Sequence, residues 1–219
     1  MEILFDRLKK ISVSSLADVD KNIRVMAKGI RRYAGIENMV GMARVVSCHN
    51  DFLKVLRTLN EAKEGEVLVV DAKESDRAVL GGLFCTEAHR KGLAGIAVDG
   101  PIRDIVYVEK LDLPVYARYS CPCAGSVNEL SVTEEPILVG DVEVYSGDVI
   151  VGDGDGIVVA DLSFFQNIID KAEEIEKKEL ELMDKMKNGI PLASMLNLEE
   201  HVDGLMRGES GSLQFKVEE

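Results

Sequence analysis

Apolar runs alternate with segments of helical periodicity along roughly the first half of the chain. The runs have the length of strands that are buried on both faces of a sheet; they lie at residues 40–47, 67–70, 93–98 and 115–117. The segments between them predict helices at 52–62, 76–90 and 102–110, and a short helix at 3–10 comes first. This order predicts an α/β fold with at least partly parallel strand pairing.

Polar residues and glycines indicate where these helices begin. Ser14 and Ser15 precede the segment LADVD, as at a capped helix start, and Asp51 is placed to cap the helix at 52–62. That helix would bury Leu53, Leu56 and Leu59 on one face. A glycine pair inside 76–90 would cost about 1 kcal/mol per glycine relative to alanine. The pair therefore indicates a close backbone approach, or a helix that begins near Gly82.

The pattern changes after residue 136. Short β-rich pieces over 137–160 are separated by Gly-Asp turns, which predicts an antiparallel meander. A long helix follows at about 162–187, supported in water by pairs of opposite charge four residues apart. Gly189 and Pro191 end it, and a second short helix is expected at about 192–206. We therefore expect one α/β domain over 1–160. A helical extension over 161–219 would pack on the same or a neighbouring subunit.

Composition restricts the class of protein. Of the 219 residues, 46% are apolar and 30% are charged, a mixture that can bury a core and keep a solvated surface. The formal net charge of −13 would repel a phosphate backbone, so we expect no nucleic-acid partner. No apolar stretch reaches the length of a membrane span, and the N-terminus lacks the order of a secretory signal. A cytoplasmic location without membrane contact is expected.

The four cysteines do not form a recognisable metal or redox motif. Cys121 and Cys123 are separated by a single residue rather than the two of a redox or zinc motif, and Cys48 has no second Cys/His pair in register. In a cytoplasmic chain of this length, thiols need not pair. We therefore expect reduced, structural cysteines and no zinc site.

The segment Asp99–Asp104 at the end of a buried strand carries the candidate chemistry, because sites in α/β sheets gather at that edge. Gly100 and Pro101 are expected to force a turn there. Arg103 offers a planar fork suited to a carboxylate. Asp104 offers hard oxygen ligands suited to Mg²⁺ or Mn²⁺. The alternative, left open by the pattern, is an aspartate favoured near a helix N-terminus and an arginine that only pairs with it.

A second candidate is the segment Gly81-Gly82-Leu83 at a predicted helix start. Free backbone N–H groups there could hold a substrate carboxylate, and small residues would let a ligand approach the backbone. Plain packing of the helix on the sheet is the alternative. Asp71, Glu74 and Asp76 follow a strand and could reach the same edge, although most such carboxylates are only solvated.

Taken together, these segments resemble the RraA-like family, which includes 4-hydroxy-4-methyl-2-oxoglutarate aldolase. The likeness covers roughly residues 10–185 and rests on the order and spacing of six pieces, at 14–18, 64–71, 76–83, 92–104, 145–148 and 154–157. The resemblance implies a swivelling β/β/α-type fold with a mixed sheet core, a β-meander and a helical tail. It also implies a homotrimer or hexamer with active sites at subunit interfaces.

The resemblance also implies roles for individual residues. Asp104 would hold the divalent metal, Mg²⁺ or Mn²⁺. Arg103 would bind the carboxylate of a pyruvate-like 2-oxo acid, with help from the backbone amides of Gly81, Gly82 and Leu83. A chelated cation withdraws electrons from the ketone and stabilises the enolate formed on C–C cleavage. The implied activity is therefore that of a metal-dependent lyase, either by retro-aldol release of pyruvate or by decarboxylation of oxaloacetate.

One position departs from the aldolase pattern. The aldolases carry an acidic residue where this chain has Gly82, and that acid orders metal-bound water. Asp71, Glu74, Asp76 or a tail acid such as Glu199 from another subunit could substitute for it. The alternatives are an enzyme with a different substrate, and a non-catalytic regulator that binds a ribonuclease by protein contact, as other members of the family do. The intact Arg103-Asp104 pair favours the enzyme.

Overall fold

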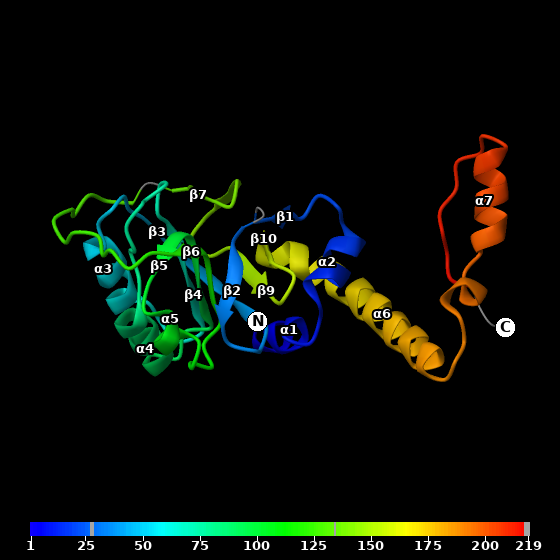
Figure 1. The fold of residues 1–219 in the computed structure, drawn as a ribbon, viewed down its shortest axis with the longest axis horizontal. Helices are drawn as coiled ribbons and strands as arrows, with labels where there is room; N and C mark the ends of the chain where they lie inside the picture. Colours follow the sequence, from blue (N-terminus) through cyan, green and yellow to red (C-terminus); the bar gives the residue numbers. More distant parts are fainter. Residues whose placement is uncertain (27–28, 134, 217–219) are drawn as a thin grey trace. The chain divides into compact units, whose positions relative to one another are not determined.

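The computed structural model of the chain describes residues 1–26, 29–133 and 135–216. It divides into two compact units, Met1–Ala172 and Glu173–Glu219. In its described part, the first unit holds a mixed sheet of eight strands, covered by helices, and a separate two-stranded hairpin (Figure 1). The α/β class expected from the alternating pattern is confirmed.

The centre of the sheet is a block of four parallel strands, in the spatial order β3-β4-β5-β6. They are β3 (Met39–Ser47), β4 (Glu66–Asp71), β5 (Gly95–Ile102) and β6 (Val115–Ser120). Residues 67–70 are fully buried, as expected for a strand covered on both faces. The carboxyl ends of these four strands meet at one edge of the sheet.

Antiparallel strands extend the block on both sides. On the β3 side the order is β9 (Val149–Gly152), β10 (Ile157–Ala160) and β1 (Arg24–Val25), and on the other side β2 (Arg31–Ala34) pairs with β6. The hairpin of β7 (Ile137–Val139) and β8 (Val142–Val144) forms a sheet of its own. The predicted meander is therefore two antiparallel hairpins that belong to different sheets.

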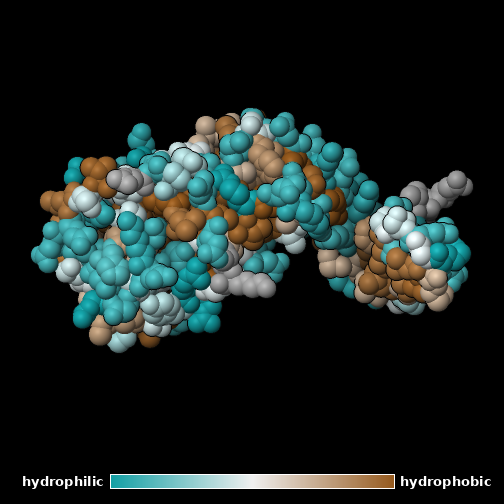
Figure 2. All heavy atoms as spheres, turned by 90° about the horizontal axis from the view of Figure 1, so that it is seen from above, coloured by the Kyte–Doolittle hydropathy of each residue, from teal (hydrophilic) through white to brown (hydrophobic). Residues whose placement is uncertain are grey.

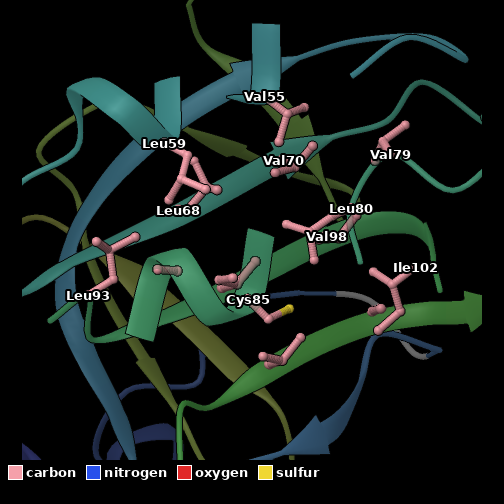
Figure 3. Packing of buried hydrophobic residues seen from close by; sticks show 14 of the residues in the cluster. Val55, Leu59, Leu68, Val70, Val79, Leu80, Cys85, Leu93, Val98 and Ile102 are labelled. Carbon is pink, nitrogen blue, oxygen red and sulfur yellow. The ribbon is translucent and has the colours of Figure 1, made fainter. Parts of the chain in front are cut away.

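Helices and the small hairpin cover opposite faces of the large sheet. Neighbouring residues of β3 point to opposite faces of the sheet. Val46 packs with α3 (Leu53–Glu61) and α4 (Gly82–Arg90) on one face, and Val45 packs with the β7–β8 hairpin on the other. Figure 3 shows the helical side, where Val55 and Leu59 of α3 lie over Leu68 and Val70 of β4.

At the β9–β10 end, three helices pack on the side of the sheet where Val40 points. These are α1 (Glu2–Leu8), α2 (Val13–Val19) and the first part of α6 (Leu162–Lys187). The buried residues of α6 are Phe165, Ile168, Ile169 and Ala172, all of which belong to the first unit.

Several predicted details are wrong. Ser12 caps α2 by accepting a hydrogen bond from the Ser15 N–H at 3.2 Å, so the cap lies before the predicted serines. In α3, Leu59 is buried but Leu56 is 44% exposed, because Val55 rather than Leu56 faces the sheet. Asp51 accepts a hydrogen bond from the Leu53 N–H at 3.0 Å but lies one residue before the cap position, which Phe52 occupies.

Gly100 and Pro101 do not form the predicted turn but continue β5, with a shift of register between Val98 and Pro101. A Cβ atom on Gly100 would lie 2.5 Å from the Cβ of Ala72, so the close approach of the neighbouring chain requires glycine there. An irregularity of this kind is also where a strand tolerates proline. The helix that follows, α5 (Ile105–Val108), is therefore much shorter than the predicted 102–110.

The second unit contains the end of α6, a 3₁₀ turn, η1 (Leu192–Met195), and α7 (Leu198–Met206). The helix predicted at 192–206 is thus interrupted before Leu198. Several apolar side chains of this unit are exposed, among them Val202, Leu205, Met206, Leu213 and Phe215. Brown spheres mark apolar surface at the right of Figure 2. Among the described residues, no helix combines the length and the apolar character that a bilayer crossing requires.

Candidate functional site

Arg103 and Asp104 lie directly after β5, beside the segment that leads into α4. The Arg103 N–H donates to the carbonyl oxygen of Leu80 at 3.0 Å, and Leu80 forms a parallel bridge with Ile102. These backbone contacts place Gly81 and Gly82 next to the Arg-Asp pair. The two candidate segments, which the sequence analysis treated separately, therefore lie next to each other in the structure.

Asp104 has a left-handed backbone conformation, with φ of 60° and ψ of 36°, and it occupies the cap position of α5. Its Oδ2 accepts a hydrogen bond from the Gly82 N–H, the first residue of α4, at 3.1 Å. A left-handed residue other than glycine costs about 1–3 kcal/mol and persists where its surroundings hold it. The strain and the hydrogen bond together fix the Asp104 carboxylate at the N-terminus of α4.

The Arg103 guanidinium makes only a loose contact with this carboxylate. Its Nε lies 3.6 Å from Asp104 Oδ2, and both side chains are 40% exposed. A pair of this exposure and distance contributes little to stability. The two groups are thus accessible to a ligand rather than locked together in the interior.

The glycine pair allows this packing. A Cβ on Gly81 would lie 2.7 Å from Asp104 Oδ2 and 2.8 Å from Arg103 Cγ, whereas a Cβ on Gly82 would have 3.3 Å to the nearest atom. Only Gly81 is therefore excluded from carrying a side chain by the present positions of Arg103 and Asp104. As proposed from its glycines, α4 begins at Gly82 rather than at residue 76.

A small open cavity of about 30 Å³ lies beside the pair, which is room for roughly two water molecules. Phe52 and Phe84, in edge-to-face contact with ring centroids 5.7 Å apart, form an apolar wall of it. Of the four predicted substrate-binding residues, Arg103, Gly81 and Leu83 line it, although 82% of Leu83 is exposed. A 2-oxo acid is larger than the cavity, so most of it would lie above this floor.

The oxygen donors here suit Mg²⁺ or Mn²⁺ better than a metal that needs a complete protein cage. Among the described residues, no group of three or more His, Cys, Asp or Glu side chains could hold a metal ion. Mg²⁺, however, keeps several waters and often takes only one or two protein carboxylates together with substrate oxygens. The half-exposed Asp104 carboxylate fits that pattern as a single protein ligand.

A larger cavity of about 660 Å³ lies on the other face of the sheet edge. It contains two of the predicted alternative acids, Asp71 and Glu74, and neither lines the Arg103–Asp104 cavity. The Arg118 side chain, which lines this cavity, forms an ion pair with Asp99. Because four carboxylates line this cavity against one lysine and one arginine, it is less suited to an anionic acid than the site at Arg103.

The environment of Asp71 shows that this larger cavity disfavours negative charge. Burial raises the pKa of its carboxyl group, and the neighbouring Asp99 adds to the effect. Asp71 and Asp99 occupy paired positions on β4 and β5, so their side chains point to the same side. The ionised form of Asp71 is thus held at some cost in the folded protein.

Some residues of the site could not be found from the sequence. Phe52, Phe84 and Ala124 line the cavity but come from three separate segments, and apolar residues in a helix or loop carry no signal of a site. The Asp99–Arg118 ion pair joins neighbouring strands across the sheet. In the sequence, this ion pair was indicated only by a charged residue near the end of each of the two apolar runs that form β5 and β6.

Comparison with known proteins identifies the family to which the chain belongs. A family model described as RraA-like, Aldolase/RraA, matches residues 8–159. A protein of Halalkalibacterium halodurans, provisionally named a 4-hydroxy-4-methyl-2-oxoglutarate aldolase, is 32% identical over 170 residues, which cover 77% of this chain and 81% of that protein. An uncharacterized protein of Methanocaldococcus jannaschii is 33% identical over 196 residues, 88% of this chain and 93% of its own length.

A solved structure with a different description is similar as well. RraAS2 of Streptomyces coelicolor, described as an unusual member of the RNase ES inhibitor RraA protein family, superposes with a TM-score of 0.70 at 31% identity. The match covers 81% of this chain and 93% of that one. The family model spans most of the first unit, including both halves of the Arg103–Asp104 site, and the chain therefore belongs to the RraA-like family, Aldolase/RraA.

Proposed function

We propose that this chain is a divalent-metal-dependent lyase that releases pyruvate from a 2-oxo acid, by decarboxylation of oxaloacetate or by retro-aldol cleavage. One observation carries the proposal. A guanidinium and a carboxylate, each 40% exposed, border the same cavity at the N-terminus of a helix. This arrangement offers a binding group for a carboxylate beside a hard oxygen ligand.

The residues divide the work by their chemistry. Arg103 would hold the substrate carboxylate through its fork of N–H donors. The Gly82 N–H already donates to Asp104, so the remaining backbone N–H groups of the first turn of α4 would add positive potential. Asp104 would orient the substrate's carbonyl end by holding Mg²⁺ or Mn²⁺. A bound cation would supply electron withdrawal from the ketone oxygen and so stabilise an enolate. Phe52 and Phe84 would exclude water from one side.

Gly82 makes decarboxylation the easier of the two reactions. Retro-aldol cleavage requires a base that removes the proton from the substrate hydroxyl group. Loss of CO₂ from oxaloacetate leaves the same enolate without any such base, and the enolate then needs only a proton. No carboxylate is available at position 82, and Asp71 and Glu74 line a different cavity. We expect turnover of oxaloacetate to exceed aldol cleavage.

The open site also favours a role for neighbouring subunits. Only a floor of about 30 Å³ is formed by one chain, so a second chain would cover the substrate in a homotrimer or hexamer. A cytoplasmic location, without nucleic-acid or membrane partners, fits the net charge of −13.

The test is pyruvate release from oxaloacetate with Mg²⁺ or Mn²⁺, compared with the same reaction after chelation. Arg103→Ala should raise KM about 10- to 100-fold, because a charged hydrogen-bonded contact to the substrate contributes about 1.5–3 kcal/mol. Asp104→Ala should abolish the metal-dependent rate. The matched control is Arg90→Ala at the other end of α4, where the arginine pairs with Glu87 at the surface. No turnover in the wild type, or equal turnover in Asp104→Ala, would refute the proposal.

A second function, that of a non-catalytic ribonuclease regulator, is favoured by Gly82 and by the 31% identity with RraAS2. It predicts capture of a ribonuclease by the immobilised chain in a pull-down. The Asp104→Ala variant should capture as much as the wild type, since protein contact does not need the metal ligand. No enrichment over a control protein would count against this function.

A further inference from the structure

The four cysteines differ in their exposure. Cys48 and Cys85 are buried, and burial raises the pKa of each thiol to about 12, so both are poor nucleophiles. Cys123 is exposed and Cys121 is partly exposed. The two reachable thiols are therefore the pair separated only by Pro122, and this pair is not part of the structural core.

The loop that carries this pair is already bent. Two residues in an extended chain span at most about 7 Å, and the chain bends at Pro122 and Cys123. The Cys121 Sγ lies 3.3 Å from the carbonyl oxygen of Asp76 and 3.8 Å from that of Cys123, so the first thiol lies on the side of the chain where the second residue's backbone is. Cα atoms joined by a disulfide lie about 4.4–6.8 Å apart. The separation open to two such residues in a bent chain thus falls within the range that a disulfide allows.

We propose that Cys121 and Cys123 form a dithiol–disulfide exchange site whose substrates are low-molecular-weight disulfides. A Cys123 thiolate attacks one sulfur of the substrate and releases one thiol. Cys121 then attacks the mixed disulfide, forms the Cys121–Cys123 bond and releases the second thiol. The two cysteines lose two protons and two electrons, and the substrate disulfide is reduced to two thiols.

The small ring makes this couple reversible. Exposed or strained disulfides are more readily reduced than structural ones, and they are the labile or regulatory ones. A disulfide that spans one residue closes a tight ring, and Pro122 restricts the backbone further. The bond should therefore open and close within the range of cellular thiol buffers rather than persist.

Oxidation of the pair would change the conformation of the Arg103 site, because backbone hydrogen bonds connect both cysteines to it. The Cys121 N–H donates to the carbonyl of Ile102 at 2.9 Å, and Ile102 directly precedes Arg103. The Ala78 N–H donates to the carbonyl of Cys123 at 2.8 Å, and Ala78 lines the cavity. Contraction of the loop would pull on both segments, the end of β5 and the stretch that contains Ala78. This consequence for substrate binding, unlike the exchange itself, rests on the proposed function.

The test uses the full-length protein in buffers of reduced and oxidised glutathione, with rapid alkylation and mass spectrometry. The wild type should lose two alkylatable thiols together, with a mass decrease of two hydrogens and a Cys121–Cys123 cross-link in the digest. A Cys48→Ala/Cys85→Ala variant should behave identically. Cys121→Ser and Cys123→Ser should instead accumulate a glutathione adduct. Persistent adducts on the wild type, or thiols that stay reduced at high oxidised glutathione, would overturn the proposal.

Hydrogen exchange tests the link to the site without any activity measurement. Amides of 78–82 and 102–104 should exchange several-fold faster in the oxidised wild type than in the reduced form. The Cys121→Ser variant should show no such difference. A disulfide that forms while these amides are unchanged would refute the link, although the exchange site would stand. Absence of lyase turnover with an intact thiol response would refute only the proposed function.

Discussion

Substitution of Asp104 by Asn or Ala separates the structural role of this residue from its chemical one. The left-handed backbone and the hydrogen bond from the Gly82 N–H are structural features. Asn tolerates the left-handed conformation at least as well as Asp and keeps an acceptor oxygen. Ala keeps neither. The negative charge, which would hold the metal, is lost in both variants.

The free energies follow from these contacts. Ala at a left-handed position costs about 1 kcal/mol more than Asp or Asn. Loss of the acceptor at the Gly82 N–H costs about 1 kcal/mol, because water from the adjacent cavity can partly replace it. Asp104→Ala should therefore lower the free energy of unfolding by about 2 kcal/mol. Asp104→Asn loses only the interaction of its charge with the N-terminus of α4, about 0.5 kcal/mol.

Two measurements decide the matter. Urea denaturation gives the free energy of unfolding, and calorimetric titration with Mn²⁺ gives the metal affinity. Both variants should lose metal binding, but only Asp104→Ala should lose much stability. Asp112→Asn, at an exposed position, is the control and should change neither quantity. If Asp104→Asn were as unstable as Asp104→Ala, the backbone argument would be wrong. Wild-type Mn²⁺ affinity in Asp104→Asn would remove the assigned metal ligand.

Four further predictions concern the site, the larger cavity and the tail. Gly81→Ala should weaken Mn²⁺ binding in the same titration, because its Cβ would lie 2.7 Å from Asp104 Oδ2. Gly82→Asp should raise aldol cleavage relative to decarboxylation in pyruvate-release assays, because it supplies a base beside Asp104. Asp71→Asn should have a higher free energy of unfolding than the wild type at neutral pH, measured by urea denaturation. Burial raises the pKa of the Asp71 carboxyl in the folded protein. The stability of the wild type therefore falls as the pH rises from the unfolded-state pKa to the folded-state pKa. The gain should vanish below the unfolded pKa, about 3.9. A chain ending at Ala172 should melt cooperatively by circular dichroism, since every buried residue of α6 is retained.

Much of the fold could be predicted because single segments carry their own signal. The run at 67–70 is apolar at every position and is a central strand, and the glycine pair indicated where α4 begins. The long helix at 162–187 agrees with its prediction in both bounds. In each case the local preference of the segment and its place in the fold agree, so the pattern alone was sufficient.

The errors arose where a neighbouring segment decides the conformation. Gly100 and Pro101 favour a turn, but Ala72 approaches so closely that Gly100 serves packing within a strand. Leu56 follows the helical spacing of Leu53 and Leu59, yet the sheet contacts the face that contains Val55. Such choices depend on contacts between distant residues, which a pattern within one segment does not contain.

The two glycines at the site have different physical origins, and the difference bears on the reaction. Gly81 is required by geometry, because any side chain would displace Arg103 or Asp104. Gly82 is not required by geometry. It is a helical residue, and a Cβ added to it would lie 3.3 Å from the Cβ of Asp104, a contact that a shift of a few tenths of an ångström would relieve. The helix dipole favours an acid in the first turn, whereas the Asp104 carboxylate, with Oδ2 3.6 Å from this Cβ, would repel it unless a cation lay between them. Packing therefore does not explain the missing acid, whereas neither of the proposed functions, decarboxylation or binding of a ribonuclease, would need a base at this position.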